Sequence, residues 1–358
     1  MIGLTITSSW GNGHATTWRS LARALHALGH DVAFLERDAP WYARERDLTD
    51  PPYCDVRLYD SNEALFGDHR RDVASADAVI VGSYVREGVA VGRWVQETAR
   101  GVRAFYDIDT PITLEKLAAG DEEYLAAALV PGYDVYLSFT GGRALRELEE
   151  TYGSPRARAL HCSVDPDAYF PERRPRRWDL GYLGTYSDDR QPTLERVVVE
   201  PARRRPGRRF VVAGPQYPGG LEWPANVERI EHLPPAAHRG FYCAQRATVN
   251  VTRAAMRRMG HAPSVRLFEA AACGTAIVSD RWEGLDELLS PGEELLLAET
   301  PEESLAILDG MSDAELTRIG AAARERVLAS HTARRRAEEL IGHLEAAGAG
   351  ACAGEARA

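Results

Sequence analysis

The segment from Pro263 to Thr275 holds the residues best suited to bind a charged ligand. Pro263 and Ser264 can open a helix, because proline fits the first turn and a serine oxygen can accept one of the unpaired N–H groups there. Amide groups at a helix start attract phosphate. Glu269 follows about one and a half turns later, where its carboxylate could accept both hydroxyls of a ribose. The spacing predicts a nucleotide-binding helix that ends at Gly274; the alternative is an ordinary amphipathic helix with Glu269 in solvent.

A second candidate loop covers residues 8–17, between the first predicted strand and the first predicted helix. Such a loop lies at the carboxyl edge of a parallel sheet, where open α/β folds bind ligands. His14 could take a proton from a hydroxyl group, since an imidazole has an ordinary pKa of about 6.5. It could equally be bonded to the backbone at a helix start. Trp10, Gly11 and Gly13 are predicted to border the hydroxyl-bearing molecule.

Two carboxylates, Asp107 and Asp109, directly follow the strand predicted over Val102–Tyr106. They would border the same edge of the sheet as His14. Their D-x-D spacing is typical of some metal sites, but magnesium sites usually also use substrate phosphates, which we expect in the other half of the chain. We therefore predict no metal ligand here. Either aspartate could orient His14 or hydrogen-bond the reacting molecule, or both could cap the following turn.

Arginine must supply the positive charge for any bound diphosphate. Lys116 is the only lysine and lies in no G-x-x-x-x-G-K-[ST] motif, so a P-loop enzyme is excluded. Arg190 follows a predicted strand and Gly184, a residue that allows close backbone approach. Arg253 is the second candidate. Arg266 is the third, if its side chain folds back over the helix start.

Short apolar runs alternate with helical periods in both halves of the chain, as in parallel sheets covered by helices. In the first half we predict strands over Ile2–Thr7, Asp31–Leu35, Asp55–Tyr59, Ala78–Val81, Val102–Tyr106 and Asp134–Phe139. In the second half we predict strands over Asp179–Leu183, Arg209–Ala213, Val227–Ile230, Ala247–Val251, Thr275–Val278 and Glu294–Leu297. The fold class is therefore α/β, with two doubly wound sheets.

The length of 358 residues exceeds what one hydrophobic core usually supports. A segment rich in proline and arginine separates the two strand series and predicts a linker. Near the end, Ser312 and Glu315 predict a capping box that opens an amphipathic helix. The predicted divisions are a first domain over 1–164, a linker over 165–177, a second domain over 178–330, a terminal helix over 331–347 and a disordered tail over 348–358.

Three segments of the chain resemble a known family: residues 8–14, residues 178–186 and the 263–275 stretch. They are similar to nucleotide-sugar glycosyltransferases of the group 1 type, which have the GT-B fold, and among these to the spore-maturation CgeB-like branch. The resemblance covers nearly the whole chain. It implies two Rossmann-like domains facing across a cleft and a terminal helix that crosses back onto the first domain.

The resemblance also assigns roles to residues. The family has a Glu, seven residues and a second Glu, followed by Ala-x-Ala-x-Gly. The second Glu, a ribose ligand, matches Glu269, whereas His261 replaces the first, which contacts the donor sugar. The predicted donor-binding residues are Gly184, Arg190, Arg253, His261, Ser264, Val265, Arg266 and Glu269.

The activity implied by the resemblance is transfer of a sugar from a nucleotide-sugar donor to a hydroxyl or similar group of an acceptor, without a metal or other cofactor. His14 would be the base, with Asp107 and Asp109 beside it. The stereochemical outcome stays open, because His261 departs from the retaining pattern while His14 suggests an inverting base.

Composition excludes several other classes. The formal net charge of −10 argues against a nucleic-acid partner. No run of about 18 apolar residues predicts a membrane span, and no signal peptide is apparent, so we expect a cytoplasmic protein. The five cysteines are scattered and form no C-x-x-C motif, which predicts reduced thiols and no zinc site.

The main alternative is an NAD-dependent oxidoreductase. The loop from Gly11 to Thr16 fits two positions of a G-x-G-x-x-G fingerprint, and Glu36 follows the next strand where a ribose-binding acid would lie. Thr16 replaces the third glycine. A nucleotide-sugar epimerase and a non-catalytic binding protein are further alternatives on the same architecture.

Overall fold

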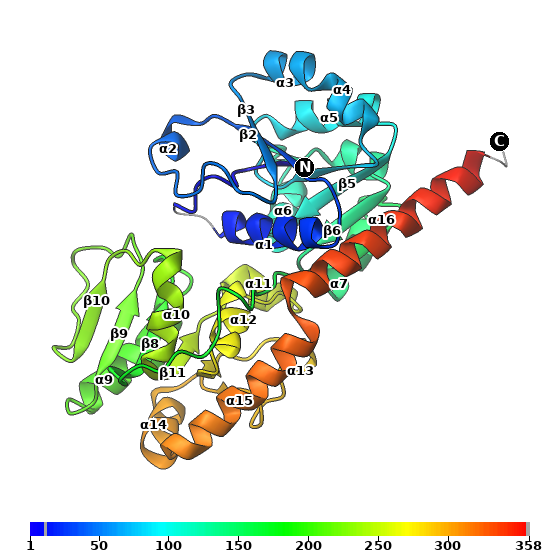
Figure 1. Ribbon diagram of the computed structural model, residues 1–358. Helices are drawn as coiled ribbons and strands as arrows, with labels where there is room; N and C mark the ends of the chain where they lie inside the picture. Colours follow the sequence, from blue (N-terminus) through cyan, green and yellow to red (C-terminus); the bar gives the residue numbers. More distant parts are fainter. Residues whose placement is uncertain (11–12, 356–358) are drawn as a thin grey trace. The chain divides into compact units, whose positions relative to one another are not determined.

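The computed structural model describes residues 1–10 and 13–355, with side chains as far as Ala349 (Figure 1). The chain divides into two compact units. The first contains Met1–Cys162 together with the C-terminal segment from Ala333, and the second contains Ser163–Thr332.

Within the described residues, the first unit is built on a seven-stranded parallel sheet with the order β3-β2-β1-β4-β5-β6-β7. Its strands are β1 Ile2–Gly3, β2 Ala33–Arg37, β3 Asp55–Tyr59, β4 Ala78–Gly82, β5 Val102–Asp107, β6 Val135–Ser138 and β7 Ala157–Ala159. Its helices are α1 His14–Ala27, α2 Pro40–Ala43, α3 Asn62–Asp68, α4 Arg70–Ser75, α5 Gly88–Thr98, α6 Thr110–Ala118, the 3₁₀ helix η1 Ala127–Gly132, α7 Arg143–Glu150 and α16 Ala333–Glu355.

Trp18 organises the core of this unit. Its ring meets Phe34 and Tyr106 edge to face, with both centroid distances at 5.4 Å. The terminal helix α16 lies beside α1 and buries Ala337 and Leu340 completely in the same core (Figure 1). Small and branched apolar residues on one face of α16 let the two helices pack closely, so a segment distant in sequence completes the first unit.

The second unit contains, among the residues described, a six-stranded parallel sheet with the order β10-β9-β8-β11-β12-β13. Its strands are β8 Trp178–Leu183, β9 Phe210–Ala213, β10 Val227–Ile230, β11 Gln245–Asn250, β12 Ala276–Ser279 and β13 Leu296–Leu297. Its helices are α8 Gln191–Leu194, the π-helical segment η2 Glu195–Val199, α9 Glu200–Arg204, α10 Pro235–Cys243, α11 Ala254–Met259, α12 Val265–Ala272, α13 Leu285–Leu288, α14 Pro301–Gly310 and α15 Asp313–Ser330.

The predicted fold class is confirmed, and every predicted strand is present. Strand β1 is much shorter than predicted, because the chain leaves the sheet after Gly3 and its amides at Ile6 and Thr7 bond to the Glu36 carboxylate instead. Strand β7 has three residues, too few for an alternating pattern, and was not predicted. Helix α16 continues past residue 347, where we expected a tail, because alanine-rich sequence favours helix.

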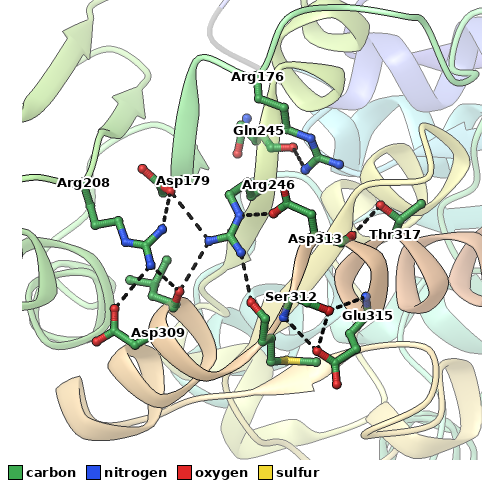
Figure 2. A network of polar contacts seen from close by, with 12 residues as sticks. Arg176, Asp179, Arg208, Gln245, Arg246, Asp309, Ser312, Asp313, Glu315 and Thr317 are labelled. Carbon is green, nitrogen blue, oxygen red and sulfur yellow. Dashed lines mark hydrogen bonds and ion pairs between the residues drawn. The ribbon is translucent and has the colours of Figure 1, made fainter.

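The predicted opening of α15 is confirmed. Ser312 and Glu315 form a reciprocal capping box, and Leu316, Ile319 and Val327 are buried on the inner face of the helix. The start of α15 is also tied to the sheet by Arg246 at the beginning of β11. Its guanidinium pairs with Asp313 at 2.5 Å and lies 3.6 Å from Asp179 (Figure 2).

No helix within residues 1–10 and 13–355 has the length and apolar character needed to cross a bilayer.

Candidate functional site

In the second unit, three predicted ligand-binding segments meet at the carboxyl ends of the strands. Gly184 follows β8 and donates its N–H to the carbonyl of Ala213 at the end of β9. A side chain at Gly184 would collide with the Tyr182 hydroxyl and the Arg266 guanidinium. Glycine is therefore required by the close approach of these groups.

Arg266 folds back over the start of α12 toward β8 and β11. Its Nε donates to the Leu183 carbonyl, its Nη1 donates to Asn250 Oδ1 at 3.3 Å and to Ser264 Oγ at 3.2 Å, and the guanidinium lies 5.0 Å from the centre of the Tyr182 ring. This is the orientation on which its predicted role depends. Among the described residues, each of these hydrogen-bond acceptors of the cation is a neutral oxygen.

Arg190 has similar surroundings. Its Nε donates to Ser187 Oγ at 3.1 Å, and its Nη2 donates to the Thr185 carbonyl at 2.7 Å. Burial lowers the pKa of Arg190, and the neighbouring charges of Arg266 and Arg253 lower it further. The three predicted arginines are thus close enough to repel one another. Such a cluster is stabilised by an anion placed among them.

Asp189 is the carboxylate nearest to this cluster. Its Oδ2 accepts the N–H of Ala254 at 2.7 Å, and the Ser187 hydroxyl also donates to it. Burial acts to raise the pKa of Asp189, but these hydrogen bonds and the charges of Arg253 and Arg190 lower it overall. Asp189 therefore stays ionised and holds the loop before α8 against α11.

Ser264 caps α12 as the sequence predicted. Its Oγ accepts the N–H of Arg266 at 3.3 Å, and the helix begins at Val265. The N–H of Val265 belongs to the first turn, which no carbonyl within the helix can satisfy. The helix ends at Ala272 with Cys273 as its C-cap, and Gly274 follows with a φ of +70°, the left-handed conformation typical of the residue after a helix.

Glu269 is buried, with only 5% of its surface exposed. Tyr242 donates its hydroxyl to Oε2 at 3.2 Å, Tyr169 is a further hydrogen-bond partner, and His238 Nδ1 lies 3.9 Å from Oε2. The alternative of a carboxylate in solvent is therefore wrong. A carboxylate has about four acceptor positions, so the tyrosines do not exhaust it.

His261, which replaces the first Glu of the family pattern, adopts a left-handed backbone with φ of +48°. Its N–H donates to the Glu283 carbonyl at 2.6 Å. Its ring lies between two carboxylates, with Nδ1 3.2 Å from Glu287 and Nε2 3.6 Å from Glu283. The acidic side chains beside His261 come from the loop before α13 and from α13 itself.

In the first unit, Glu36 closes the loop after β1. Its completely buried carboxylate accepts four hydrogen bonds, from Thr5 Oγ1 at 3.0 Å, Ile6 N at 2.7 Å, Thr7 N at 3.0 Å and Thr7 Oγ1 at 2.6 Å. These donors fill its acceptor positions. Glu36 therefore has no place for ribose hydroxyls, and the oxidoreductase alternative loses the acid on which it depended.

His14 is the first residue of α1, after Gly13 at the N-cap position. Its ring packs edge-on against Tyr84 at 5.3 Å, and burial lowers its pKa to about 4. Within the described part of the chain, its Nδ1 is buried without a hydrogen-bond partner. The ring is therefore a neutral acceptor near neutral pH. Of the other residues predicted in this loop, Trp10 is 49% exposed, and Gly11 lies outside the described residues.

The two predicted aspartates have different environments. Asp109 accepts the hydroxyl of Tyr84 at 3.0 Å, which connects it through Tyr84 to His14. Asp107 is completely buried and accepts the hydroxyls of Tyr136 at 2.7 Å and Thr113 at 2.8 Å and the N–H of Asp109 at 3.1 Å.

These contacts decide between the two interpretations of Asp107. The residue caps the turn into α6, and a bound molecule cannot reach its carboxylate. Burial raises the pKa of Asp107 to about 6, although the hydrogen bonds act in the opposite direction. Among the residues described, no three His, Cys, Asp or Glu side chains gather as a metal-binding group.

Several neighbours of these sites were not predicted. They are the aromatic residues Tyr84, Tyr124 and Tyr136 in the first unit and Tyr169, Tyr242 and His238 in the second. These residues are distant in sequence from the site residues that they contact, so no local sequence pattern predicted the contacts.

Residues 190–342 match a family model described as glycosyl transferase-like. This match covers less than half of the chain, most of it in the second unit. The chain has the GT-B fold. Among curated proteins, none matches the sequence.

The similar solved structures cover almost the whole chain. They include sucrose-phosphate synthase from Thermosynechococcus elongatus, with 16% identity, a TM-score of 0.66 and coverage of 97% of this chain and 99% of that one. HepE from Anabaena, in complex with UDP-glucose, has 11% identity, a TM-score of 0.71 and coverage of 96% and 99%. The α,α-trehalose 6-phosphate synthase from Burkholderia multivorans has 13% identity, a TM-score of 0.65 and coverage of 98% of both chains. At these identities the likeness shows the fold.

Proposed function

We propose that this protein transfers a sugar from a nucleotide-sugar donor to a hydroxyl group of an acceptor, and that the second unit binds the donor. The observation that carries the proposal is the pair of guanidinium groups of Arg190 and Arg266. Both lie where strands of the second unit end, and both are hydrogen-bonded to neutral oxygens. A diphosphate supplies the negative charge that this arrangement lacks.

Bond cleavage between the sugar and the diphosphate leaves negative charge on the leaving phosphate. Arg190, Arg266 and the first-turn amides of α12 are in place before the reaction, so they stabilise this charge without rearrangement. Arg253 contributes positive charge to the same cluster. We expect no metal ion or other cofactor to be needed.

Glu269 is proposed to accept the ribose hydroxyls of the donor. The tyrosine contacts hold its carboxylate in one orientation on α12, one turn and a half from the amides that face the diphosphate. HepE was crystallised with UDP-glucose, which makes UDP-sugars the first donors to test. His261, held between Glu283 and Glu287, is proposed to border the donor sugar.

His14 is proposed as the base that accepts the proton of the acceptor hydroxyl. Its lowered pKa keeps the ring neutral, so one ring nitrogen is unprotonated and can accept a proton. Tyr84 packs against the ring and donates to Asp109, so both residues position His14. Asp107 supports them from inside the turn. We propose that, within group 1 enzymes, the protein is closest to the CgeB-like branch, because the motifs at residues 8–14 and 178–186 resemble that branch.

Calorimetric binding of nucleoside diphosphates tests the donor site. Arg190→Ala should weaken UDP binding by about 1.5–3 kcal/mol, the contribution of a hydrogen bond to a charged group. Arg203 is a matched control, because it is an arginine of the same unit that pairs with Glu195 on the surface. Arg203→Ala should leave the affinity unchanged. Equal affinities of wild type and Arg190→Ala would remove Arg190 from the site.

A further inference from the structure

Two cysteines of the second unit, Cys243 and Cys273, lie side by side although 30 positions separate them. Cys243 is the last residue of α10, and Cys273 is the C-cap of α12. Two hydrogen bonds join the neighbouring residues: Tyr242 Oη donates to Glu269, and Thr275 Oγ1 donates to the Tyr242 carbonyl at 2.9 Å. The two thiols are close enough for each to shift the pKa of the other.

Both cysteines line one cavity of about 190 Å³, which is large enough for a small oxidant. Cys243 is partly exposed, whereas Cys273 is 4% exposed. Arginines form much of the remaining wall, including Arg174, Arg176 and Arg246. Figure 2 shows Arg176 beside Gln245, whose carbonyl it bonds at 2.9 Å, and Arg246 fixed by Asp313. Glu172 also lines the cavity and pairs with Arg174, so the wall is polar and carries more arginine than carboxylate side chains.

The two thiols differ in character. When protonated, Cys243 Sγ donates to the Phe170 carbonyl at 3.7 Å, and it accepts the N–H of Glu172 at 3.3 Å. The neighbouring Cys273 thiol, the Glu172 amide and the charge of Arg174 lower the pKa of Cys243 to about 7 in spite of burial. The same thiol contact, together with burial, raises the pKa of Cys273. Because Cys243 is also the more exposed of the two, we expect it to be the nucleophile of the pair and Cys273 to be the protonated partner.

We propose that Cys243 and Cys273 form a redox-active thiol pair that a hydroperoxide converts to a disulfide. The Cys243 thiolate attacks the terminal oxygen of the hydroperoxide, the O–O bond breaks, and the departing alkoxide or hydroxide takes a proton. Cys243 is then a sulfenic acid. The Cys273 sulfur attacks that sulfur, the S–S bond forms, and the sulfenic oxygen leaves as water with the Cys273 proton. The two sulfurs supply both electrons, and an external thiol reductant restores them.

This chemistry resides in the two sulfurs alone and does not depend on sugar transfer. The disulfide would connect the ends of α10 and α12 one turn after Glu269. Loss of the thiol chemistry would therefore leave the donor site as described, and loss of donor binding would leave the thiol chemistry intact.

Mass spectrometry of the full chain tests the proposal. The reduced protein is treated with hydrogen peroxide and digested without reductant. We expect a cross-linked peptide joining Cys243 to Cys273, with the loss of two hydrogen masses and complete reversal by dithiothreitol. A Cys243 that stays a free thiol, or a cross-link to Cys54, Cys162 or Cys352 instead, would overturn the proposal.

Single variants identify the order of the steps. In Cys273→Ser the sulfenic acid should persist at Cys243 and be captured by dimedone, whereas Cys243→Ser should give no dimedone adduct at Cys273. Cys162→Ser is the matched control, because it removes a buried cysteine of the first unit, and it should form the disulfide as wild type does. Dimedone capture at Cys273 rather than at Cys243 would reverse the assigned roles and contradict the proposal.

Discussion

The two sheets of this protein carry different kinds of polar groups at their carboxyl ends. In the second unit, Arg190 and Arg266 are cations held by neutral oxygens. In the first unit, the Asp107 carboxylate accepts three hydrogen bonds from hydroxyl and amide groups, and His14 is neutral. The edge of the second sheet therefore carries a cluster of cations next to the Asp189 carboxylate, whereas the edge of the first sheet carries a hydrogen-bonded carboxylate and a neutral imidazole.

This difference matches what each ligand needs. A nucleoside diphosphate is bound by fixed positive charge, whereas an acceptor hydroxyl needs one base with a defined orientation. Substitutions in the two units should consequently affect different measured quantities. Substitutions in the second unit should change the affinity for the donor, and substitutions in the first unit should change the rate of sugar transfer.

The largest effect is expected at His14. His14→Ala should lower kcat by about 10²–10⁴-fold, the usual contribution of a general base, while the Kd for UDP stays unchanged. His26, an exposed histidine in the last turn of the same helix, is the matched control. Because burial lowers the pKa of His14 to about 4, the ring stays neutral from pH 8 to pH 6, and its protonation should not reduce wild-type kcat in that range. A His14→Ala variant with weaker UDP binding and an unchanged kcat would contradict the assignment of donor binding to the second unit and proton transfer to the first.

A stability effect is expected from Asp107 in the first unit. Its pKa rises from 3.8 to about 6 in the folded protein, so the folded state binds more protons than the unfolded state between these values. Its contribution to stability is fully present below pH 3.8 and is lost as pH rises through 6. Asp107→Asn removes this dependence, and the unfolding free energy of wild type relative to the variant should fall by about 3 kcal/mol between pH 3.5 and pH 7.

Denaturant unfolding of both proteins across this pH range measures the difference directly. Asp134→Asn is a control, because the pKa of Asp134 is lowered overall by its contacts with Arg103, and its pH dependence should have the opposite sign. Parallel curves for wild type and Asp107→Asn would show that the Asp107 carboxyl titrates normally.

The smallest effect is expected at Glu269. Glu269→Gln keeps an oxygen for the ribose but removes the charge, so UDP binding should weaken by about 1 kcal/mol for each ribose hydrogen bond. Wild type should bind UDP more tightly than 2′-deoxy-UDP, and the variant should discriminate less. Identical discrimination by both proteins would mean that Glu269 serves only to anchor Tyr169 and Tyr242.

The sequence predicted the parts of this account that depend on local pattern. Ser264 caps α12, Gly274 ends it, and Ser312 with Glu315 opens α15, because these signals lie within a few residues of the helix that they delimit. The side chain of Arg266 folds back over the start of α12, which was the condition of its predicted role, and that role stays a prediction.

The remaining parts depend on contacts between distant residues. Tyr136 reaches Asp107 from another strand, and Tyr242 reaches Glu269 from another helix, at sequence separations of 29 and 27 residues. Glu36 likewise bonds to residues distant in sequence, because it accepts the amides of Ile6 and Thr7 after β1. These bonds take the two residues out of the sheet, so the first strand is shorter than predicted. Contacts of this kind form only when the chain has folded, so the sequence contains no local pattern that predicts them.

The most direct test of the central claim is a crystal structure of the protein with UDP. The account predicts diphosphate oxygens within hydrogen-bond distance of the Arg190 and Arg266 guanidinium groups and of the first-turn amides of α12, with the ribose on Glu269. A UDP molecule bound instead to the loop of residues 8–17, with Arg266 still bonded only to Leu183, Asn250 and Ser264, would contradict it.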